Sequence, residues 1–155
     1  MKKKLLYRLI LYCATVFFVI QFFQPKKNNS FDSENSITET EQLPDSIQSI
    51  LKNACMNCHS NQTHYFWYDR IAPASWYVNS HIKDGKKKLN FSEWGNLKPL
   101  DKISLLNKII DETKDRHMPL KSYKLMHKPA RLTDDQVKML DDWAESLGMQ
   151  IYKNR

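Results

Sequence analysis

Residues 54–62 of the chain read ACMNCHSNQ, with Cys55 and Cys58 three positions apart and His59 directly after the second thiol. Four chemistries use such a thiol pair: a structural zinc site, a redox dithiol, a plain disulfide, and covalent attachment of haem. The rest of the sequence has to decide between them, because each chemistry needs different partners elsewhere in the chain.

The first three chemistries lack those partners. A zinc site needs four ligands, usually from two such pairs. The third cysteine, Cys13, lies in an apolar N-terminal stretch, and the remaining histidines are not paired at the spacing typical of zinc ligands. A redox dithiol of the thioredoxin type sits in a βαβ unit, and the sequence shows no convincing strand pair. A plain disulfide leaves His59 unexplained.

Covalent haem gives all three residues a role. On one helical turn, two cysteines three apart can both reach the vinyl groups at one edge of a porphyrin, and the next residue can direct its imidazole at the iron. C-x-x-C-H is the attachment pattern of c-type haem. We therefore predict haem c, with its iron, as the cofactor, Cys55 and Cys58 as thioether ligands, and His59 as one axial ligand of the iron.

A second axial ligand of the iron must come from further along the chain. Met118 lies in the stretch RHMPLKSY, in the loop before the last predicted helix, and is our candidate. A thioether is a soft ligand that favours reduced iron and raises the potential. Met126 and Met149 are further candidates without a supporting sequence context. His117, His127 and His81 are the histidine alternatives, and two histidine ligands would give a lower potential.

Aromatic side chains are dense in the stretch after the motif. They are Phe66, Trp67, Tyr68, Trp76, Phe91 and Trp94. Few basic residues lie among them, which disfavours a nucleic-acid stacking surface, and we expect no nucleic-acid partner. We expect these rings to wall an apolar haem pocket, where indole and phenol groups can bind the propionates. Trp67 and Trp76 are predicted to contact the haem.

The N-terminus carries nearly all of the net charge of +7, because residues 1–27 hold six of the 24 basic residues and no acidic residue. Leu5 to Phe23 is predominantly apolar, and a bilayer core of about 30 Å needs ~20 helical residues. The flanking charges favour a cytoplasmic N-terminus. We therefore expect residues 1–25 to be an anchor, or an uncleaved signal, that crosses the inner membrane once and leaves the rest in the periplasm.

The remaining chain divides into a polar segment and one folded domain. Residues 26–43 have few apolar side chains and are expected to be a flexible linker. Residues 44–155 are expected to form an all-α domain, because no alternating β-branched run appears. Apolar spacing and end signals predict four helices. These run from Asp45 to Ala54, from Ala74 to about Lys83, from Pro99 to about Lys114, and from Thr133 to Gly148.

Several motifs occur together along this domain. They are Cys55–Asn61, Trp67-Tyr68, Ile71-Ala72-Pro73, Trp76, Leu89–Trp94, Met118-Pro119-Leu120, Tyr123, His127, Leu132-Thr133 and Trp143. Over about residues 44–147 the chain resembles the bacterial haem-binding domain family related to cytochrome c. The resemblance implies a cytochrome c-like haem domain with His59 as the proximal ligand and Met118 as the distal ligand, but no particular partner.

The sequence thus predicts a membrane-anchored monohaem c-type cytochrome. It would transfer single electrons between redox protein partners in the periplasm and would be an electron carrier rather than an enzyme. A haem-based sensor or a peroxidase-like enzyme is the alternative, and it requires an open or displaceable sixth position on the iron. A haem subunit of a larger complex is a third possibility.

Overall fold

The described part of the protein is built from helices, and the predicted all-α class is confirmed. The computed structural model describes residues 2–30 and 34–154. Within these residues the only β pairing is a single bridge between Asn29 and Gln62. The four longest helices are α1 (Lys2–Ile20), α5 (Ala74–Lys88), α6 (Pro99–Lys114) and α8 (Asp134–Lys153).

Shorter helical segments lie between the long helices. The α-helical ones are α2 (Ile37–Thr40), α3 (Asp45–Ala54), α4 (Met56–His59) and α7 (Lys121–Met126). The 3-10 segments are η1 (Trp67–Arg70), η2 (Phe91–Asn96) and η3 (Lys128–Ala130). The predicted helix at Pro99 has the bounds that the sequence indicated. Asp45, expected to cap its helix, is instead the first residue of α3, with Pro44 at the cap position. The helix at Ala74 runs five residues further than expected, to Lys88.

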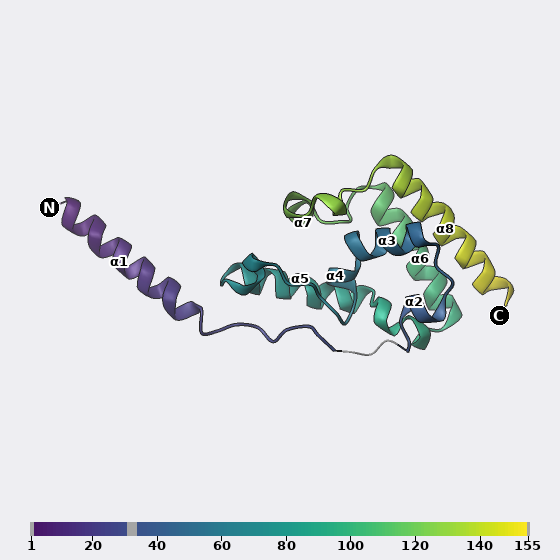
Figure 1. The fold of residues 1–155 in the computed structure, drawn as a ribbon, viewed down its shortest axis with the longest axis horizontal. Helices are drawn as coiled ribbons and strands as arrows, with labels where there is room; N and C mark the ends of the chain where they lie inside the picture. Colours follow the sequence, from purple (N-terminus) through teal and green to yellow (C-terminus); the bar gives the residue numbers. More distant parts are fainter. Residues whose placement is uncertain (1, 31–33, 155) are drawn as a thin grey trace.

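The hydrophobic core lies where α3, α6 and α8 meet, with α2 and η2 closing it. Helices α3, α6 and α8 each contribute apolar residues three or four positions apart, which places them on one face. The buried members are Ile37, Ile47, Ile50, Leu51, Phe91, Trp94, Leu106, Ile109, Ile110, Leu140, Ala144 and Leu147. The core therefore sits at the C-terminal end of the molecule, where Figure 1 shows α6 and α8 side by side.

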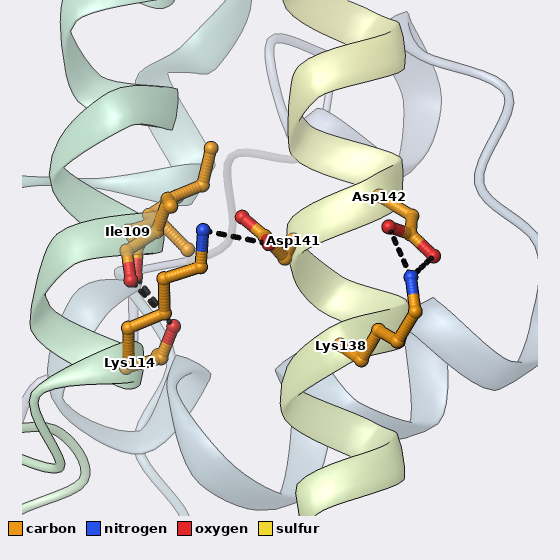
Figure 2. Close-up of polar contacts among 7 residues, drawn as sticks. Ile109, Lys114, Lys138, Asp141 and Asp142 are labelled. Carbon is orange, nitrogen blue, oxygen red and sulfur yellow. Dashed lines mark hydrogen bonds and ion pairs between the residues drawn. The ribbon is translucent and has the colours of Figure 1, made fainter.

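Two ion pairs lie on the α6–α8 pair (Figure 2). Lys114 Nζ of α6 is 2.8 Å from Asp141 Oδ2 of α8, so this pair joins the two helices. Lys138 Nζ is 2.7 Å from Asp142 Oδ2 within α8, where both side chains are exposed. The lysine of each pair is exposed, and ion pairs that water reaches in this way contribute at most about 1 kcal/mol. Apolar packing is therefore the main interaction between these helices.

The last helix is longer than the sequence indicated. The expected end at Gly148 is wrong, because α8 continues to Lys153. Ile151, one turn beyond the glycine, packs against the core. Burial of that side chain outweighs the cost of about 1 kcal/mol that a glycine imposes on a helix interior.

The N-terminal helix α1 does not have the properties predicted for it. Among the residues that the structure describes, no helix is both long enough and apolar enough to cross a bilayer. The apolar part of α1, from Leu9 to Ile20, spans only about 18 Å at 1.5 Å per residue, and three lysines and Arg8 precede it. The predicted single-pass helix and inner-membrane location are therefore wrong.

The segment before α3 packs on the core. Ile37 has no accessible surface. Glu41 Oε1 accepts hydrogen bonds from Trp94 Nε1 at 2.9 Å and from Lys102 Nζ at 3.1 Å. The described residues 34–43, which fall in the expected linker, thus share the core of the domain.

Candidate functional site

The C-x-x-C-H motif forms one tight turn at the end of α3. The amide of Cys55 donates to the Leu51 carbonyl at 2.9 Å, which closes the last turn of α3. The amides of Cys58 and His59 then donate to the Cys55 carbonyl at 3.1 and 3.0 Å. Residues three and four positions apart share a face of a helical turn. The structure therefore brings Cys55, Cys58 and His59 to the same side of the chain.

The imidazole of His59 is held with one nitrogen free. Its Nδ1 lies 3.1 Å from the Leu89 carbonyl at the C-terminus of α5. A carbonyl only accepts hydrogen bonds, so Nδ1 carries the proton and Nε2 keeps its lone pair. Burial lowers the pKa of His59, against the hydrogen bond to Leu89, so the ring is neutral at pH 7. A neutral imidazole with free Nε2 suits a metal ligand.

Both motif thiols are uncharged and unbridged. Burial, with a smaller effect of neighbouring Cys58, raises the pKa of Cys55 to about 12. Burial and the nearby carboxylate of Asp69 raise the pKa of Cys58 to about 11. The structure has both cysteines free. Because the thiolate is the nucleophile of thiol–disulfide exchange, these two protonated thiols are poorly suited to that chemistry.

Helix α5 packs directly against the backbone of the motif. A Cβ at Gly85 would lie 2.8 Å from the carbonyl oxygen of Cys58, closer than real Cβ atoms come. The residue at position 85 must therefore be a glycine for α5 to approach α4 as it does. This approach also brings the C-terminus of α5, with the Leu89 carbonyl, to the His59 ring.

A group of polar aromatic side chains links the motif to α7. Asn57 Nδ2, inside the motif, donates to the Tyr123 hydroxyl at 2.7 Å. A short hydrogen bond joins the Tyr68 hydroxyl of η1 to His127 Nε2. The His127 ring is buried, with ring centroids 4.1 Å from Phe66 and 4.2 Å from Tyr123. Burial lowers the pKa of His127, so this ring is also neutral at pH 7.

Asp69 is a buried carboxyl group beside this group of rings. Its Oδ2 accepts the Phe66 amide at 2.8 Å, and its Oδ1 is buried without a hydrogen-bond partner in the structure. Burial raises the pKa of Asp69, although the Phe66 amide and His127 oppose the shift. The neighbourhood of the Cys58 thiol thus contains a polar atom that no described protein group satisfies.

A broad hollow of about 1250 Å³ opens on the other face of α4. Met56 and Asn57 line it from the motif, and Tyr123, Met126 and His127 line it from the α7 region. Its charged lining residues are Lys52 and Lys128, and no carboxylate is among the residues that line it. An anionic group such as a porphyrin with two propionates meets no like charge there. Cys55, Cys58 and His59 are not part of this lining, so the donor chemistry, not the hollow, defines the site.

The other predicted haem contacts lie on three separate segments. Met118 is half-buried in the turn between α6 and α7, and its amide donates to the Glu112 carbonyl at 2.9 Å. Trp67 is 71 % exposed on η1, and Trp76 is 40 % exposed with its Nε1 donating to the Phe23 carbonyl at 2.6 Å. None of the three lines the hollow, and their roles stay predictions.

Comparison with protein families indicates the cofactor. The sequence model of a family described as haem-binding domain matches residues 15–146. The chain belongs to this family. The match covers most of the chain and confirms the resemblance that its motifs indicated. No curated protein and no solved structure matches the chain.

Haem is therefore the cofactor of this haem-binding domain, and the residues of the motif fit it. A neutral imidazole with a free Nε2 is a usual protein ligand of haem iron, and His59 has that form. The sequence indicated Cys55, Cys58 and His59 because their spacing is local. It assigned no role to Asn57 or Asp69, because their partners are set by the tertiary fold.

Proposed function

We propose that this haem-binding domain is a monohaem c-type cytochrome that carries single electrons between redox proteins. One observation carries the proposal: two free, uncharged thiols lie one turn apart beside a buried, neutral histidine whose Nε2 is available. Each thiol would add its S–H across a vinyl group, so that a C–S and a C–H bond form and nothing is oxidised. His59 would then hold the iron from one side.

The proposed role follows from what haem supplies when bound, which is a one-electron couple at its iron. His59 Nε2 would ligate the iron, and the Leu89 carbonyl would keep the ring in the orientation and tautomer that this requires. We propose that Met118 would supply the second ligand of the iron, and its thioether would raise the reduction potential. The turn that carries Met118 is held to α6 through the Glu112 carbonyl.

Mass spectrometry and extraction test the covalent bond. The chain, produced with a c-type haem attachment system, should gain the mass of one haem and keep it through acid–acetone extraction. The Cys55→Ala/Cys58→Ala double variant should lose its haem to the solvent. Cys13→Ala is the matched control and should keep its haem, because Cys13 lies in α1. Complete extraction of haem from the unaltered protein would end the covalent proposal.

Spectroscopy tests the electron-carrier role. If Met118 ligates the iron, the oxidised protein should show the weak near-infrared band of Met–iron coordination. Met118→Ala should lose this band, whereas Met126→Ala should keep it. The reduced protein should bind carbon monoxide only after Met118 is replaced. Rapid carbon monoxide binding by the unaltered protein would contradict a six-coordinate electron carrier.

A second candidate function is a haem sensor or peroxidase-like enzyme, and the Tyr68–His127 pair favours it. Hydrogen-bonding side chains near haem, together with steric access, decide whether oxygen species bind or react. In this pair His127 is buried and Tyr68 is half-buried, and the neighbouring Asp69 carboxylate is close enough to the Cys58 thiol to raise the thiol's pKa. The same carbon monoxide measurement separates the two functions, since a sensor or peroxidase needs an open or displaceable sixth position.

A further inference from the structure

The segment 21–30, which follows α1, is hydrogen-bonded to the residues that come after the motif. The Gln21 side chain pairs with both backbone groups of Ala72, as donor to its carbonyl at 3.0 Å and as acceptor from its amide at 2.9 Å. The Phe23 carbonyl accepts the Trp76 indole N–H at 2.6 Å. We call residues 21–30 the N-terminal strap.

Asn28 is the main attachment of the N-terminal strap. Its amide donates to the Tyr65 hydroxyl at 2.7 Å, and its carbonyl accepts the Thr63 amide at 3.0 Å. Its Nδ2 donates to the Ser60 carbonyl at 2.8 Å and to Thr63 Oγ1 at 2.9 Å. Its Oδ1 accepts Lys86 Nζ at 2.6 Å. Every polar group of this half-buried residue is therefore used.

Two of these contacts provide hydrogen-bond donors for carbonyls at the C-terminal end of α4, the motif helix. Helix α4 has only four residues, so the carbonyls at its C-terminus have no partner within the helix. The Asn57 carbonyl accepts Thr63 Oγ1 at 2.7 Å, and that same hydroxyl accepts Asn28 Nδ2. The Ser60 carbonyl accepts Asn28 Nδ2 directly. A residue about thirty positions upstream thus acts as a C-terminal cap of the motif helix.

The third side-chain contact joins the strap to α5. Lys86 follows Gly85, the residue that packs against the Cys58 carbonyl. The same helix presents the Leu89 carbonyl to His59 Nδ1. Asn28 therefore binds both elements that fix the His59 ring: the turn that carries it and the helix that holds its Nδ1.

We propose that Asn28 is a positioning residue for haem binding, and that the N-terminal strap belongs to the haem-binding unit. Asn28 acts through α4 and α5 and does not itself touch the iron ligand. The family match begins at residue 15 and so includes the strap. The inference rests on the proposed function, since it assigns Asn28 the support of the His59 ligand.

The test uses the full chain with Asn28→Ala, Asn28→Asp and a neighbouring control. Asn28→Asp has the same shape but replaces both Nδ2 donor contacts with an acceptor, so it should be no better than alanine. Replacing partners that support a metal ligand typically costs 10–100-fold, and we expect the covalently loaded fraction to fall roughly tenfold. Asn29→Ala should behave as the unaltered chain, because Asn29 is exposed and its side chain has no hydrogen bond to the described residues.

The reduction potential and the spectrum of the bound haem distinguish a positioning role of Asn28 from a general loss of stability. In the Asn28 variants the haem that does attach should show a shifted reduction potential and an altered spectrum. Leu147→Ala, a core variant of α8, should lower stability but leave both unchanged. Asn28 variants with unaltered potential and spectrum would overturn the positioning role.

The proposed function has its own readout. If the unaltered chain carries no covalent haem, the cytochrome proposal fails. Asn28 can then be tested in the apoprotein by the NMR signal of the His59 Nδ1 proton. That signal should be protected from exchange in the unaltered chain and in Asn29→Ala, and it should broaden or vanish in Asn28→Ala. An unchanged signal in Asn28→Ala would overturn the inference.

Discussion

The hydrogen bond between His59 Nδ1 and the Leu89 carbonyl decides which nitrogen of the ring is available as a ligand. The sequence identified the histidine, because it directly follows the second cysteine. It did not identify its partner, because the carbonyl belongs to a residue 30 positions away and any residue has a carbonyl. The same is true of Tyr68 and His127, which are 59 positions apart. Local spacing predicts donors, whereas tertiary packing selects their orientation.

The His59 pKa predicts how the apoprotein responds to acid. Burial lowers this pKa below the ordinary value of 6.5, so between the two values the unfolded chain binds more protons than the folded one. The free energy of unfolding therefore rises with pH in this window and is lost as pH falls below about 6.5. Urea unfolding at about pH 7.5 and 5.5 should show this loss, and His59→Gln should reduce it.

His127 and Asp69 are present in both proteins of that comparison, so their titration largely cancels in the difference. His127 shifts in the same direction as His59, and Asp69 shifts in the opposite sense at lower pH. A His59→Gln variant with the same loss of stability as the unaltered apoprotein would show that the His59 ring is not buried neutral.

Gly85 predicts a contrast between two glycine substitutions. Gly85→Ala places a Cβ 2.8 Å from the Cys58 backbone oxygen, and relief of such overpacking typically costs about 1–3 kcal/mol. We expect lower stability in urea and weaker haem loading. Gly148→Ala meets nothing nearer than Leu106 Cδ1 at 3.8 Å. It should stabilise the protein by about 0.5–1 kcal/mol, because alanine is the better helix former. A stable, fully loaded Gly85→Ala would contradict the close packing of α5 on the motif.

At the scale of the elements, helix starts were predictable and helix ends were less so. Thr133 and Gln136 form the expected capping box at the start of α8, because the bonding pattern is contained in four residues. The end of α8 depends on Ile151 reaching the core, which only the fold decides. The apolar run at the N-terminus misled in another way, since α1 ends at Ile20 and its apolar part is short.

The capping box at Thr133 predicts how much this helix start contributes to the free energy of unfolding. Its Oγ1 accepts the Gln136 amide at 3.2 Å, and Gln136 Oε1 accepts the Thr133 amide at 3.0 Å. Thr133→Ala leaves the Gln136 amide, in the first turn of α8, without its partner. Loss of such a cap costs about 0.5–2 kcal/mol. Chemical denaturation should show this loss, and Thr133→Ser should restore most of it. A serine variant as unstable as alanine would mean that the threonine methyl group, not the cap, provides the stability.

At the scale of the whole molecule, the sequence placed the domain boundary at residue 44 by composition. Residues 34–43 are mostly polar, but Ile37 lies in the core and Leu43 packs against it. Ile37 has no exposed surface, and its neighbours in that core come from residues far along the chain. Composition averages over a segment and so does not detect one buried side chain.

Ile37 therefore predicts the stability that this segment contributes. Ile37→Ala removes a fully buried side chain, which costs about 2–5 kcal/mol in protein cores. Leu100→Ala is a suitable control, because Leu100 is 54 % exposed and surface substitutions usually change stability by about 0.5 kcal/mol or less. Equilibrium urea unfolding of the full chain measures both. Equal, small effects of the two variants would place residues 34–43 outside the cooperative unit.

The hydrogen bonds of Asn28 also limit how far α1 can lie from the rest of the domain. Figure 1 shows α1 extending away from the rest of the molecule, and most of its large apolar side chains are exposed. A free chain over 26–43 would span up to about 60 Å at ~3.5 Å per residue. The seven residues between Ile20 and Asn28 span at most about 25 Å. The C-terminal end of α1 therefore stays within about 25 Å of Asn28, so the hydrogen bonds of Asn28 limit where this helix can lie relative to the motif.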